Sequence, residues 1–404
     1  MKALKPQRIL IVTERFFPEE FIINELATEL GRDVAITVLT QNPSYPFDKP
    51  FPGYNNPLIS IRRWRGIKVV RGLTILGYKR NLILKLLNYI WFAFYNSLLA
   101  LFVAPGHDRI FVFHTGPLTL AIPAALAARV YRIPMSVWTQ DVWPDSVFAY
   151  GFSKRKILEY ALGEFVRWVY RRANTVLISC EGFRASVRRF APRSRLVYAP
   201  NWSTYQPIAE GSVTKTREST EFSIMFAGNV GKVQNLELVI QAFAAIEMSY
   251  PQLRLEIVGD GSNLQTLRTL AYSLGCRQVI FHGRVPVDSM AAYYQRVDAL
   301  IISLIKRPIF ALTVPSKFQS YLAAGKPILA VIEGEVARIV REKQLGVVAV
   351  PDQVESIRQA MIDLYNMDQA ERQNICKRAK NLLDSDYNRN TVIANIRDVI
   401  YSSN

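Results

Sequence analysis

Ser316 and Lys317 stand where a loop gives way to a helix, a position that favours anion binding. Pro315 ends the loop, and Gln319 follows Ser316 by three residues, which predicts a capping box. Gly325 ends the predicted helix, and a buried-strand pattern follows. Lys317 is therefore expected in the first turn, where free N–H groups and the positive end of the helix dipole attract phosphate.

A second loop offers the other half of a phosphate site. Residues 226–232, FAGNVGK, end a predicted strand and contain Gly228, Gly231 and Lys232. Glycine lets the backbone approach a phosphate closely, and lysine supplies a positive charge. Such motifs are common in strand-to-helix turns, so a tight turn with a solvated lysine is the alternative. Combined with Lys317, the loop predicts a pocket for a diphosphate.

Other short motifs are less specific. The GDG sequence at residues 259–261 reads as a structural turn. Residues 282–286, HGRVP, follow a predicted strand, and their backbone could hold a nucleotide base, although His282 could equally be an ordinary strand-end residue. Asp384 and Asp386 form a D-x-D pattern that chelates metal in some enzymes. Their position before a terminal helix favours helix capping instead.

The sequence gives no sign of a metal centre or a disulfide. The cysteines are far apart and form no C-x-x-C pair, so we expect free thiols in a reducing cytosol. The three histidines share no spacing motif, and we predict neither a metal nor another cofactor. The residues concerned are Cys180, Cys276 and Cys376, and His107, His114 and His282.

Short apolar runs alternate with helical periods along the whole chain, which predicts two doubly wound α/β domains. The 404 residues exceed one ordinary core. Strands of four to six apolar residues separated by helices indicate parallel sheets, whose ligands bind beyond the strand carboxyl ends. Residues 204–220 are polar and read as a linker. We therefore expect an N-terminal domain at 1–203 and a C-terminal domain at 221–385, facing each other across a cleft, with residues 386–404 returning to the N-terminal domain as a helix.

Positive charge is concentrated in the first half of the chain. Residues 1–205 contain 28 Lys and Arg against 13 Asp and Glu, whereas residues 206–404 contain 22 against 20. A basic half attracts an anionic surface or substrate, and both nucleic acid and an anionic membrane are candidates.

Residues 86–104 are nineteen consecutive uncharged residues, preceded by a basic stretch. Such a segment could just span a bilayer, but Asn88, Asn96 and Ser97 interrupt it. Aromatic residues at its start and basic neighbours favour a helix lying on an anionic membrane. A buried core helix is the alternative. The basic residues are Arg62, Arg63, Arg65, Lys68, Arg71, Lys79, Arg80 and Lys85. No secretion signal precedes the first strand, so we expect a peripheral or monotopic protein on the cytoplasmic face of the inner membrane.

Several motifs resemble the glycosyltransferases of family 4, which have the GT-B fold. Within that family the chain is similar to bacterial transferases of O-antigen, capsule and exopolysaccharide synthesis, including N-acetylfucosaminyl transferases. The motifs lie at residues 17–24 (FPEEFIIN), 39–46 (LTQNPSYP), 137–146 (VWTQDVWPDS), 199–202 (APNW) and 312–327.

The resemblance implies how a nucleoside diphosphate sugar would bind. Its diphosphate would lie between Gly231-Lys232 and Ser316-Lys317, with Lys232 and Lys317 stabilising the leaving group. The base would lie near Arg284 and Val285. Family members often carry two glutamates eight residues apart, but the matching positions here are Leu312 and Ser320. Ser320 could replace the ribose carboxylate only weakly.

The acceptor side is implied to lie in the N-terminal domain. Asp141 would face the reacting sugar, with capping of the next turn as its alternative. Gln140 stands where many relatives have histidine. Glu19 and Glu20, in the same motif as Asn24, would meet sugar hydroxyls unless they only line a solvated loop.

The resemblance implies a retaining, metal-independent transfer from a nucleoside diphosphate sugar, such as a UDP-sugar, to a polyprenyl-diphosphate-linked glycan. It implies surface polysaccharide biosynthesis, and hexosyl or N-acetylhexosaminyl groups would be moved. A catalytically inactive assembly partner and a basic nucleic-acid-binding protein are the alternatives, and we expect no nucleic acid partner.

Overall fold

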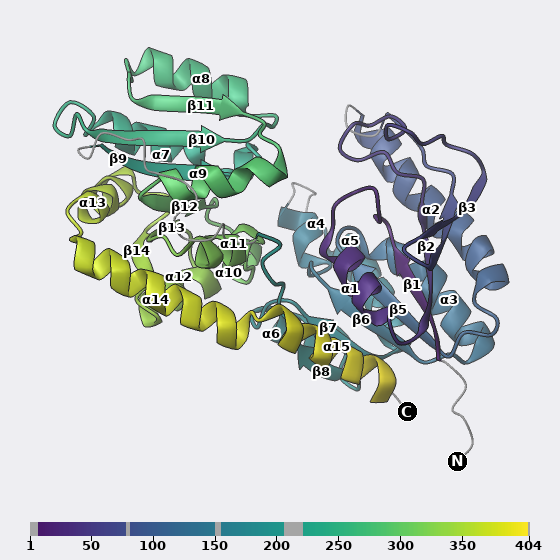
Figure 1. The fold of residues 1–404 in the computed structure, drawn as a ribbon. Coiled ribbons are helices and arrows are strands. Elements are labelled where there is room, and N and C mark those ends of the chain that lie inside the picture. Colours follow the sequence, from purple (N-terminus) through teal and green to yellow (C-terminus); the bar gives the residue numbers. More distant parts are fainter. Residues whose placement is uncertain (1–6, 78–80, 150–154, 206–220, 403–404) are drawn as a thin grey trace. The chain divides into compact units, whose positions relative to one another are not determined.

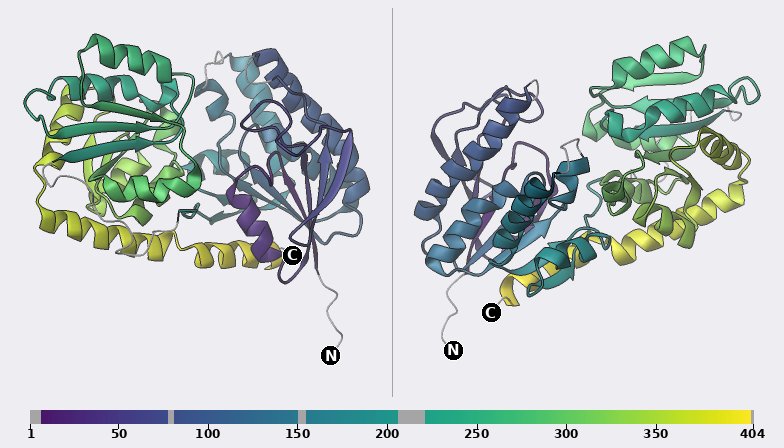
Figure 2. Two further views of the ribbon diagram at one scale, coloured as in Figure 1. Left: turned by 45° about the horizontal axis from the view of Figure 1, so that its top comes forward. Right: turned by 180° about the vertical axis from the view of Figure 1, so that it is seen from behind.

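The computed structural model describes residues 7–77, 81–149, 155–205 and 221–402. The chain divides into two compact units, residues 1–200 with 390–404, and residues 201–389. Most of the expected linker, 206–220, lies outside the described residues. Each unit is an α/β domain with helices on both faces of its sheet (Figures 1 and 2).

The N-terminal unit is built on an eight-stranded sheet of order β3-β4-β2-β1-β5-β6-β7-β8, in which only the β3–β4 pair is antiparallel. Its elements are β1 (Arg8–Thr13), α1 (Ile22–Leu30), β2 (Ala35–Gln41), β3 (Ile59–Trp64), β4 (Ile67–Gly72), α2 (Leu82–Val103), β5 (Arg109–His114), η1 (Leu118–Ala121), α3 (Ile122–Tyr131), β6 (Met135–Thr139), α4 (Asp145–Ala149), α5 (Lys156–Tyr170), β7 (Ala173–Ile178), α6 (Phe183–Phe190) and β8 (Arg195–Tyr198).

The C-terminal unit is built on a six-stranded sheet of order β11-β10-β9-β12-β13-β14, in which every pairing is parallel. Its elements are β9 (Phe222–Ala227), η2 (Lys232–Gln234), α7 (Leu236–Ala244), β10 (Leu253–Val258), α8 (Leu264–Ser273), β11 (Val279–Gly283), η3 (Val287–Ser289), α9 (Met290–Arg296), β12 (Ala299–Ser303), α10 (Pro308–Ala311), α11 (Lys317–Ala324), β13 (Ile328–Val331), α12 (Glu335–Glu342), β14 (Gly346–Ala349), α13 (Val354–Tyr365) and α14 (Gln369–Asp386).

The expected doubly wound architecture is confirmed in both units. Central strands such as β1 and β12 are almost wholly buried because helices cover both faces, which explains their continuous apolar sequences. The sequence pattern missed the β3–β4 hairpin, whose exposed basic residues hid its strand period.

The last helix, α15 (Arg389–Ser402), packs on the N-terminal unit. Arg109 donates to the Ile400 carbonyl, and Arg397 forms an ion pair with Asp33 at 3.2 Å. The D-x-D pattern does not cap this helix. Asp384 and Asp386 lie in the last turn of α14, and Asp386 accepts a hydrogen bond from Ser385. The expectation of a capping role is therefore wrong.

Candidate functional site

The loop after β9 is shaped by contacts between backbones. Gly228 has a φ of 136°, and its N–H donates to the Val258 carbonyl. Val230 donates to Asp260, and Asn263 donates back to Val230. The loop after β9 is thus joined to the GDG loop after β10 by main-chain hydrogen bonds.

Glycine is required where these two loops touch. A Cβ on Gly259 would lie 1.8 Å from the Gly228 oxygen, and one on Gly261 would lie 2.3 Å from the Val230 oxygen. Gly259 also has a φ of 137°, a conformation that L side chains rarely adopt. The GDG motif therefore packs directly against the backbone of the neighbouring loop and fixes its shape.

Lys317 begins α11 and reaches back over the end of β9. Its Nζ lies 3.6 Å from the centroid of the Phe226 ring, and a Cβ on Gly228 would lie 3.2 Å from it. The ammonium makes no ion pair with any described residue. Burial lowers the pKa of Lys317 to about 7, because the enclosed charge loses hydration. A phosphate beside it would restore the charged form.

The expected capping box at the start of α11 is wrong. Ser316 is exposed, has helical backbone angles (φ −57°, ψ −22°) and makes no side-chain cap bond. Gln319 is buried instead of reaching back to Ser316. The first-turn N–H groups are thus not covered by the Ser316 side chain.

Tyr321, one turn after Lys317, ties α11 to the same strand. Its hydroxyl accepts a hydrogen bond from the Ala227 N–H at 3.1 Å and lies 3.3 Å from the Ala227 carbonyl. The side chain is completely buried and contacts Tyr294 edge-on. No local motif marks Tyr321 in the sequence, yet this residue fixes the distance between the lysine-bearing helix and the glycine loop.

The other predicted donor residues lie around this loop with different environments. Lys232 is exposed and has no ion-pair partner in the described chain. The Gly231 N–H is occupied, since it donates to Gln234 Oε1 at 2.8 Å. Arg284 is exposed and Val285 is half-buried, directly after β11. Ser320 is half-buried in α11, three residues beyond Lys317.

His282 has a more definite role than a strand-end residue. Its Nε2 and Arg296 Nη2 both lie 2.8 Å from Glu256 Oε2, joining β10, β11 and α9. Tyr293 packs against both the imidazole and the guanidinium. This cluster holds β11 in place, and Arg284 directly follows that strand.

In the N-terminal unit, Asp141 lies two residues beyond β6. Its Oδ1 accepts a hydrogen bond from the Val142 N–H at 2.9 Å. Burial raises the pKa of Asp141 to about 6, although the Ser146 side chain and the Val142 N–H favour the ionised form. Asp141 therefore caps the turn that follows it, which was the alternative role predicted from the sequence. Its carboxyl group also has a pKa close to neutral pH.

His114 supports this segment from the end of β5. The Thr139 hydroxyl lies 2.6 Å from the Asp141 carbonyl and 2.8 Å from His114 Nδ1. A hydroxyl has one proton, and the carbonyl can only accept it. His114 Nδ1 must therefore donate to Thr139. Burial lowers the pKa of His114 to about 4, so its ring is neutral.

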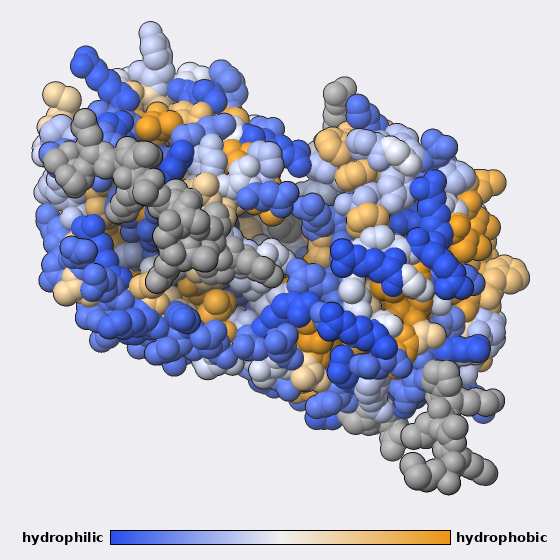
Figure 3. Space-filling model, viewed as in Figure 1, coloured by the Kyte–Doolittle hydropathy of each residue, from blue (hydrophilic) through white to orange (hydrophobic). Residues whose placement is uncertain are grey.

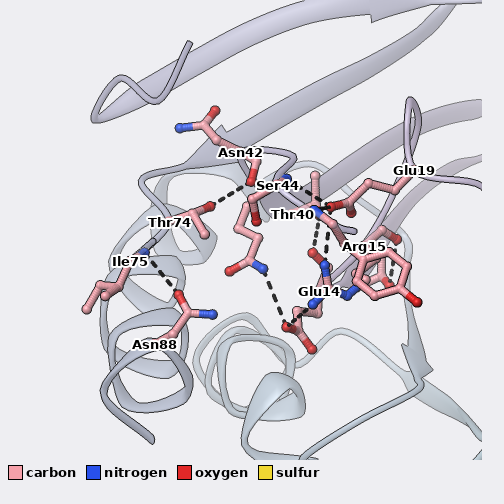
Figure 4. A network of polar contacts seen from close by, with 12 residues as sticks. Glu14, Arg15, Glu19, Thr40, Asn42, Ser44, Thr74, Ile75 and Asn88 are labelled. Carbon is pink, nitrogen blue, oxygen red and sulfur yellow. Dashed lines mark hydrogen bonds and ion pairs between the residues drawn. The ribbon is translucent and has the colours of Figure 1, made fainter. Parts of the chain in front are cut away.

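Glu19 and Asn24 hold loops together, and the contacts of Glu19 with Arg15 and Ser44 are drawn in Figure 4. Glu19 Oε1 accepts hydrogen bonds from the N–H groups of Ser44 at 3.0 Å and Tyr45 at 2.6 Å, and lies 3.2 Å from an Arg15 nitrogen. Burial raises the pKa of Glu19, opposed by Arg15. The Asn24 side chain donates to the Glu19 carbonyl and accepts from the Phe17 N–H.

Glu20 and Gln140 differ from this pair. Glu20 is exposed, while Gln140 is half-buried after β6 and its N–H donates to the His114 carbonyl. Among the described residues, no group of three or more His, Cys, Asp and Glu is arranged to hold a metal ion. Glu14 was not predicted from the sequence, although its position directly after the first strand was a signal.

Comparison with known families agrees with the geometry of both units. Residues 21–202 match the glycosyl transferase 4-like domain, and residues 212–382 match the glycosyl transferases group 1. The chain belongs to the GT-B glycosyltransferases related to family 4, as the sequence motifs predicted.

Two curated relatives are similar over part of their length. The chain is 25% identical over 247 residues to the probable glycosyltransferase WbjE of Pseudomonas aeruginosa, covering 57% of this chain and 60% of the relative. It is 25% identical over 198 residues to WcaI of Escherichia coli K12, whose name places it in colanic acid biosynthesis, covering 46% and 48%. The chain thus spans 60% or less of these two relatives.

Solved structures share the fold at low sequence identity. HepE from Anabaena in complex with UDP has a TM-score of 0.71 and 14% identity, covering 98% of this chain and 100% of that one. Sucrose-phosphate synthase from Thermosynechococcus elongatus has a TM-score of 0.72 and 13% identity, covering 97% and 98%. These similarities confirm the GT-B fold.

Proposed function

We propose that this protein transfers a sugar from a nucleoside diphosphate donor, with UDP as the favoured nucleotide, to a polyprenyl-diphosphate-linked glycan in surface polysaccharide biosynthesis. The observation that carries the proposal is the Lys317 ammonium, held over Phe226 beside Gly228 without a carboxylate partner among the described residues. A diphosphate fits such a site because the start of α11 adds the positive end of the helix dipole, where the Ser316 side chain caps no N–H group and, within the described chain, only the Phe318 N–H is bonded back, to the Pro315 carbonyl.

The chemistry follows from where charge develops. When the glycosidic bond to the donor phosphate breaks, negative charge accumulates on the diphosphate, and Lys317 and Lys232 stabilise it there. The proposal needs no metal, since two lysines and the helix N–H groups supply the positive charge. Asp141 offers a carboxyl group to the hydroxyls of the reacting sugar. We also propose that the configuration at the anomeric carbon is retained, because the resemblance to family 4 implies it.

The relatives support this reading of the substrates. HepE was solved with UDP, and the name of WcaI refers to colanic acid biosynthesis. Donor sugars of the hexosyl or N-acetylhexosaminyl type are proposed on the same basis.

The test compares UDP binding and donor hydrolysis by the wild type, Lys317→Ala and Lys232→Ala. We expect Lys317→Ala to weaken UDP binding about 10- to 100-fold, the range for hydrogen bonds to charged groups. Lys343→Ala, at an exposed position after α12, is the control. Equal UDP affinity in all four proteins would refute the phosphate site. UDP-sugar binding without turnover on any lipid-linked acceptor would favour the catalytically inactive alternative.

We further propose that α2 places the N-terminal unit on an anionic membrane. The residues that interrupt the apolar sequence face inward, since Asn88, Asn96 and Ser97 are buried. Asn88 accepts a hydrogen bond from the Ile75 N–H at 3.0 Å, and Asn96 Oδ1 lies against Gly72. The polar face of the helix is thus used inside the domain.

The opposite face of α2 is apolar and exposed. Its large side chains recur every three or four residues, which places them on one side of the helix. They are Ile83 (67% exposed), Leu86 (41%), Leu87 (45%), Ile90 (63%), Phe94 (59%), Leu98 (43%) and Phe102 (84%). Hydrophobic residues gather over α2 at the right-hand edge of Figure 3. Only 33% of the most apolar window of the helix is buried, which disfavours a plain core helix.

The neighbouring edge strand supplies charge that suits an anionic surface. Ile59, Ile61 and Arg63 lie on one face of β3 and are exposed, and exposed Arg65 follows in the turn. Arg62 is also exposed but points to the other face, over the Tyr54 ring. Arg71, counted in the same basic stretch by sequence, is buried and donates to the Phe17 carbonyl, so it does not contribute. Apolar side chains beside arginines match the two contributions that hold a protein on an anionic bilayer.

A further inference from the structure

Glu14 carries a carboxylate oxygen that the fold leaves available. The residue directly follows β1 and is 5% exposed. Both described contacts of its carboxylate go to the same atom, because Arg15 Nη2 and Gln41 Nε2 each lie 3.4 Å from Oε1 (Figure 4). Within the described parts of the chain, Oε2 has no hydrogen-bond partner.

Gly116 keeps the space in front of this oxygen open. A Cβ at position 116 would lie 3.2 Å from Glu14 Oε2, tighter than most real Cβ contacts. Gly116 follows β5, which pairs directly with β1, so both residues lie at the carboxyl edge of adjacent parallel strands. Ligands of doubly wound sheets bind at this edge.

Glu14 differs from Glu19, whose carboxylate holds a loop in place through backbone N–H groups. Glu19 receives backbone N–H bonds from Ser44 and Tyr45, which fix the following loop. The carboxylate of Glu14 receives none from the described backbone. The main chain at Glu14 is nevertheless held, because the Thr40 hydroxyl donates to the Glu14 backbone carbonyl at 3.0 Å. Oε2 is not among the fully buried oxygens that lack a partner, so water reaches it and a ligand hydroxyl can replace that water.

We propose that Glu14 Oε2 accepts a hydrogen bond from a hydroxyl of the acceptor sugar, which makes Glu14 an acceptor-binding residue. Arg15 balances the charge of the carboxylate, so the site suits a neutral hydroxyl group more than a cationic amine. The inference rests on the proposed transferase function, because it assigns a subsite to the acceptor of that reaction.

The test uses two variants of the full chain that disturb Oε2 in different ways. Glu14→Gln removes the charge at nearly constant shape, and Gly116→Ala keeps the carboxylate but places a methyl group against Oε2. The matched control is Glu29→Gln, since Glu29 also pairs with a nearby arginine, Arg32, but lies at the far end of α1. Melting temperatures of all variants are recorded.

The probes are the octyl glycosides of glucose, galactose, mannose and N-acetylglucosamine, with UDP-glucose, UDP-galactose and UDP-N-acetylglucosamine as donors. Acceptor-stimulated UDP release gives kcat and KM, and saturation-transfer NMR in the presence of UDP measures glycoside binding. We expect both Glu14→Gln and Gly116→Ala to raise the acceptor KM or Kd about 10- to 100-fold. UDP affinity and acceptor-independent donor hydrolysis should stay unchanged.

Each result bears on a different claim. Unchanged glycoside affinity in both variants, or no glycoside binding to the wild type, overturns the role of Glu14. Loss of UDP binding in the variants together with glycoside binding also overturns it, because the effect would then be structural. If the wild type binds glycosides through Glu14 but never binds UDP or a UDP-sugar, the acceptor subsite holds and the proposed donor chemistry fails.

Discussion

The ammonium nitrogen of Lys317 lies 3.6 Å from the centroid of the Phe226 ring. The two residues come from α11 and β9, and Tyr321 of the same helix bonds Ala227, the residue after Phe226. An aromatic face attracts a cation without neutralising it as a carboxylate would. The pairing therefore leaves the protonated form of Lys317 able to bind an anion.

Binding of UDP should take up a proton near pH 8. The pKa of Lys317 is lowered to about 7 by burial, so the side chain is mostly neutral at pH 8 and becomes charged when a diphosphate binds. The affinity for UDP should fall about tenfold between pH 7.5 and 8.5. Calorimetry in buffers of different ionisation enthalpy measures this uptake directly.

The control for this prediction is Lys317→Arg, because arginine stays charged throughout this range. Its UDP affinity should be nearly independent of pH from 7.5 to 8.5. The same pH dependence in both proteins would show that another group is responsible.

Gly259→Ala should disrupt the donor loop. The added Cβ would lie 1.8 Å from the Gly228 oxygen, which is backbone and cannot rotate away, at a φ of 137°. We expect a loss of about 3 kcal/mol in unfolding free energy and at least tenfold weaker UDP binding. Chemical denaturation and UDP titration measure the two effects.

Gly275→Ala is the control that isolates the conformational cost, since Gly275 has a φ of 72° and no atom within 4 Å of its Cβ position. It should cost about 1 kcal/mol and leave UDP binding intact.

Asp141→Asn should stabilise the N-terminal unit at neutral pH. The pKa of Asp141 is raised to about 6 from 3.8, so the folded state holds its proton more tightly than the unfolded state does. Stability of the wild type therefore falls as the pH rises from about 4 to 6, and the full cost applies above pH 6. The variant should be about 1–3 kcal/mol more stable at pH 7.5 and equal to the wild type near pH 3.5.

Urea unfolding followed by tryptophan fluorescence measures this difference, because five of the six tryptophans lie in the N-terminal unit. A variant less stable than the wild type at pH 7.5 would mean that ionised Asp141 makes a favourable contact that outweighs its burial.

The double variant Ile90→Glu with Phe94→Glu should release the protein from anionic vesicles. Both side chains are more than half exposed on the same face of α2, so the charges should not disturb the core. Loss of the two apolar side chains from the lipid contact should weaken binding to phosphatidylglycerol vesicles at least about tenfold in a co-sedimentation assay. Tyr272→Glu, at an 88% exposed aromatic residue in the other unit, should bind like the wild type. Equal sedimentation of all three proteins would exclude α2 as the contact.

Much of the fold followed from local patterns in the sequence. Buried strands such as β1 and β9 were expected from their apolar runs, and the helix after Ser316 was expected from its flanking residues. The two-domain GT-B architecture and the family are confirmed by the structure and the family comparisons. These properties depend on residues close together in the chain, so composition, periodicity and motifs reveal them.

The roles of individual side chains depended on contacts between distant segments. The sequence showed a lysine at position 317, but only the packing of α11 on β9 encloses it and lowers its pKa. Glu19 looked available for substrate, yet its carboxylate holds the loop at Ser44, while Glu14 keeps an oxygen open. The apolar sequence of α2 did not reveal that its asparagines face inward. The sequence by itself determined which elements form, and tertiary packing decided which atoms are buried, paired or available, because burial depends on neighbours that lie far away in the chain.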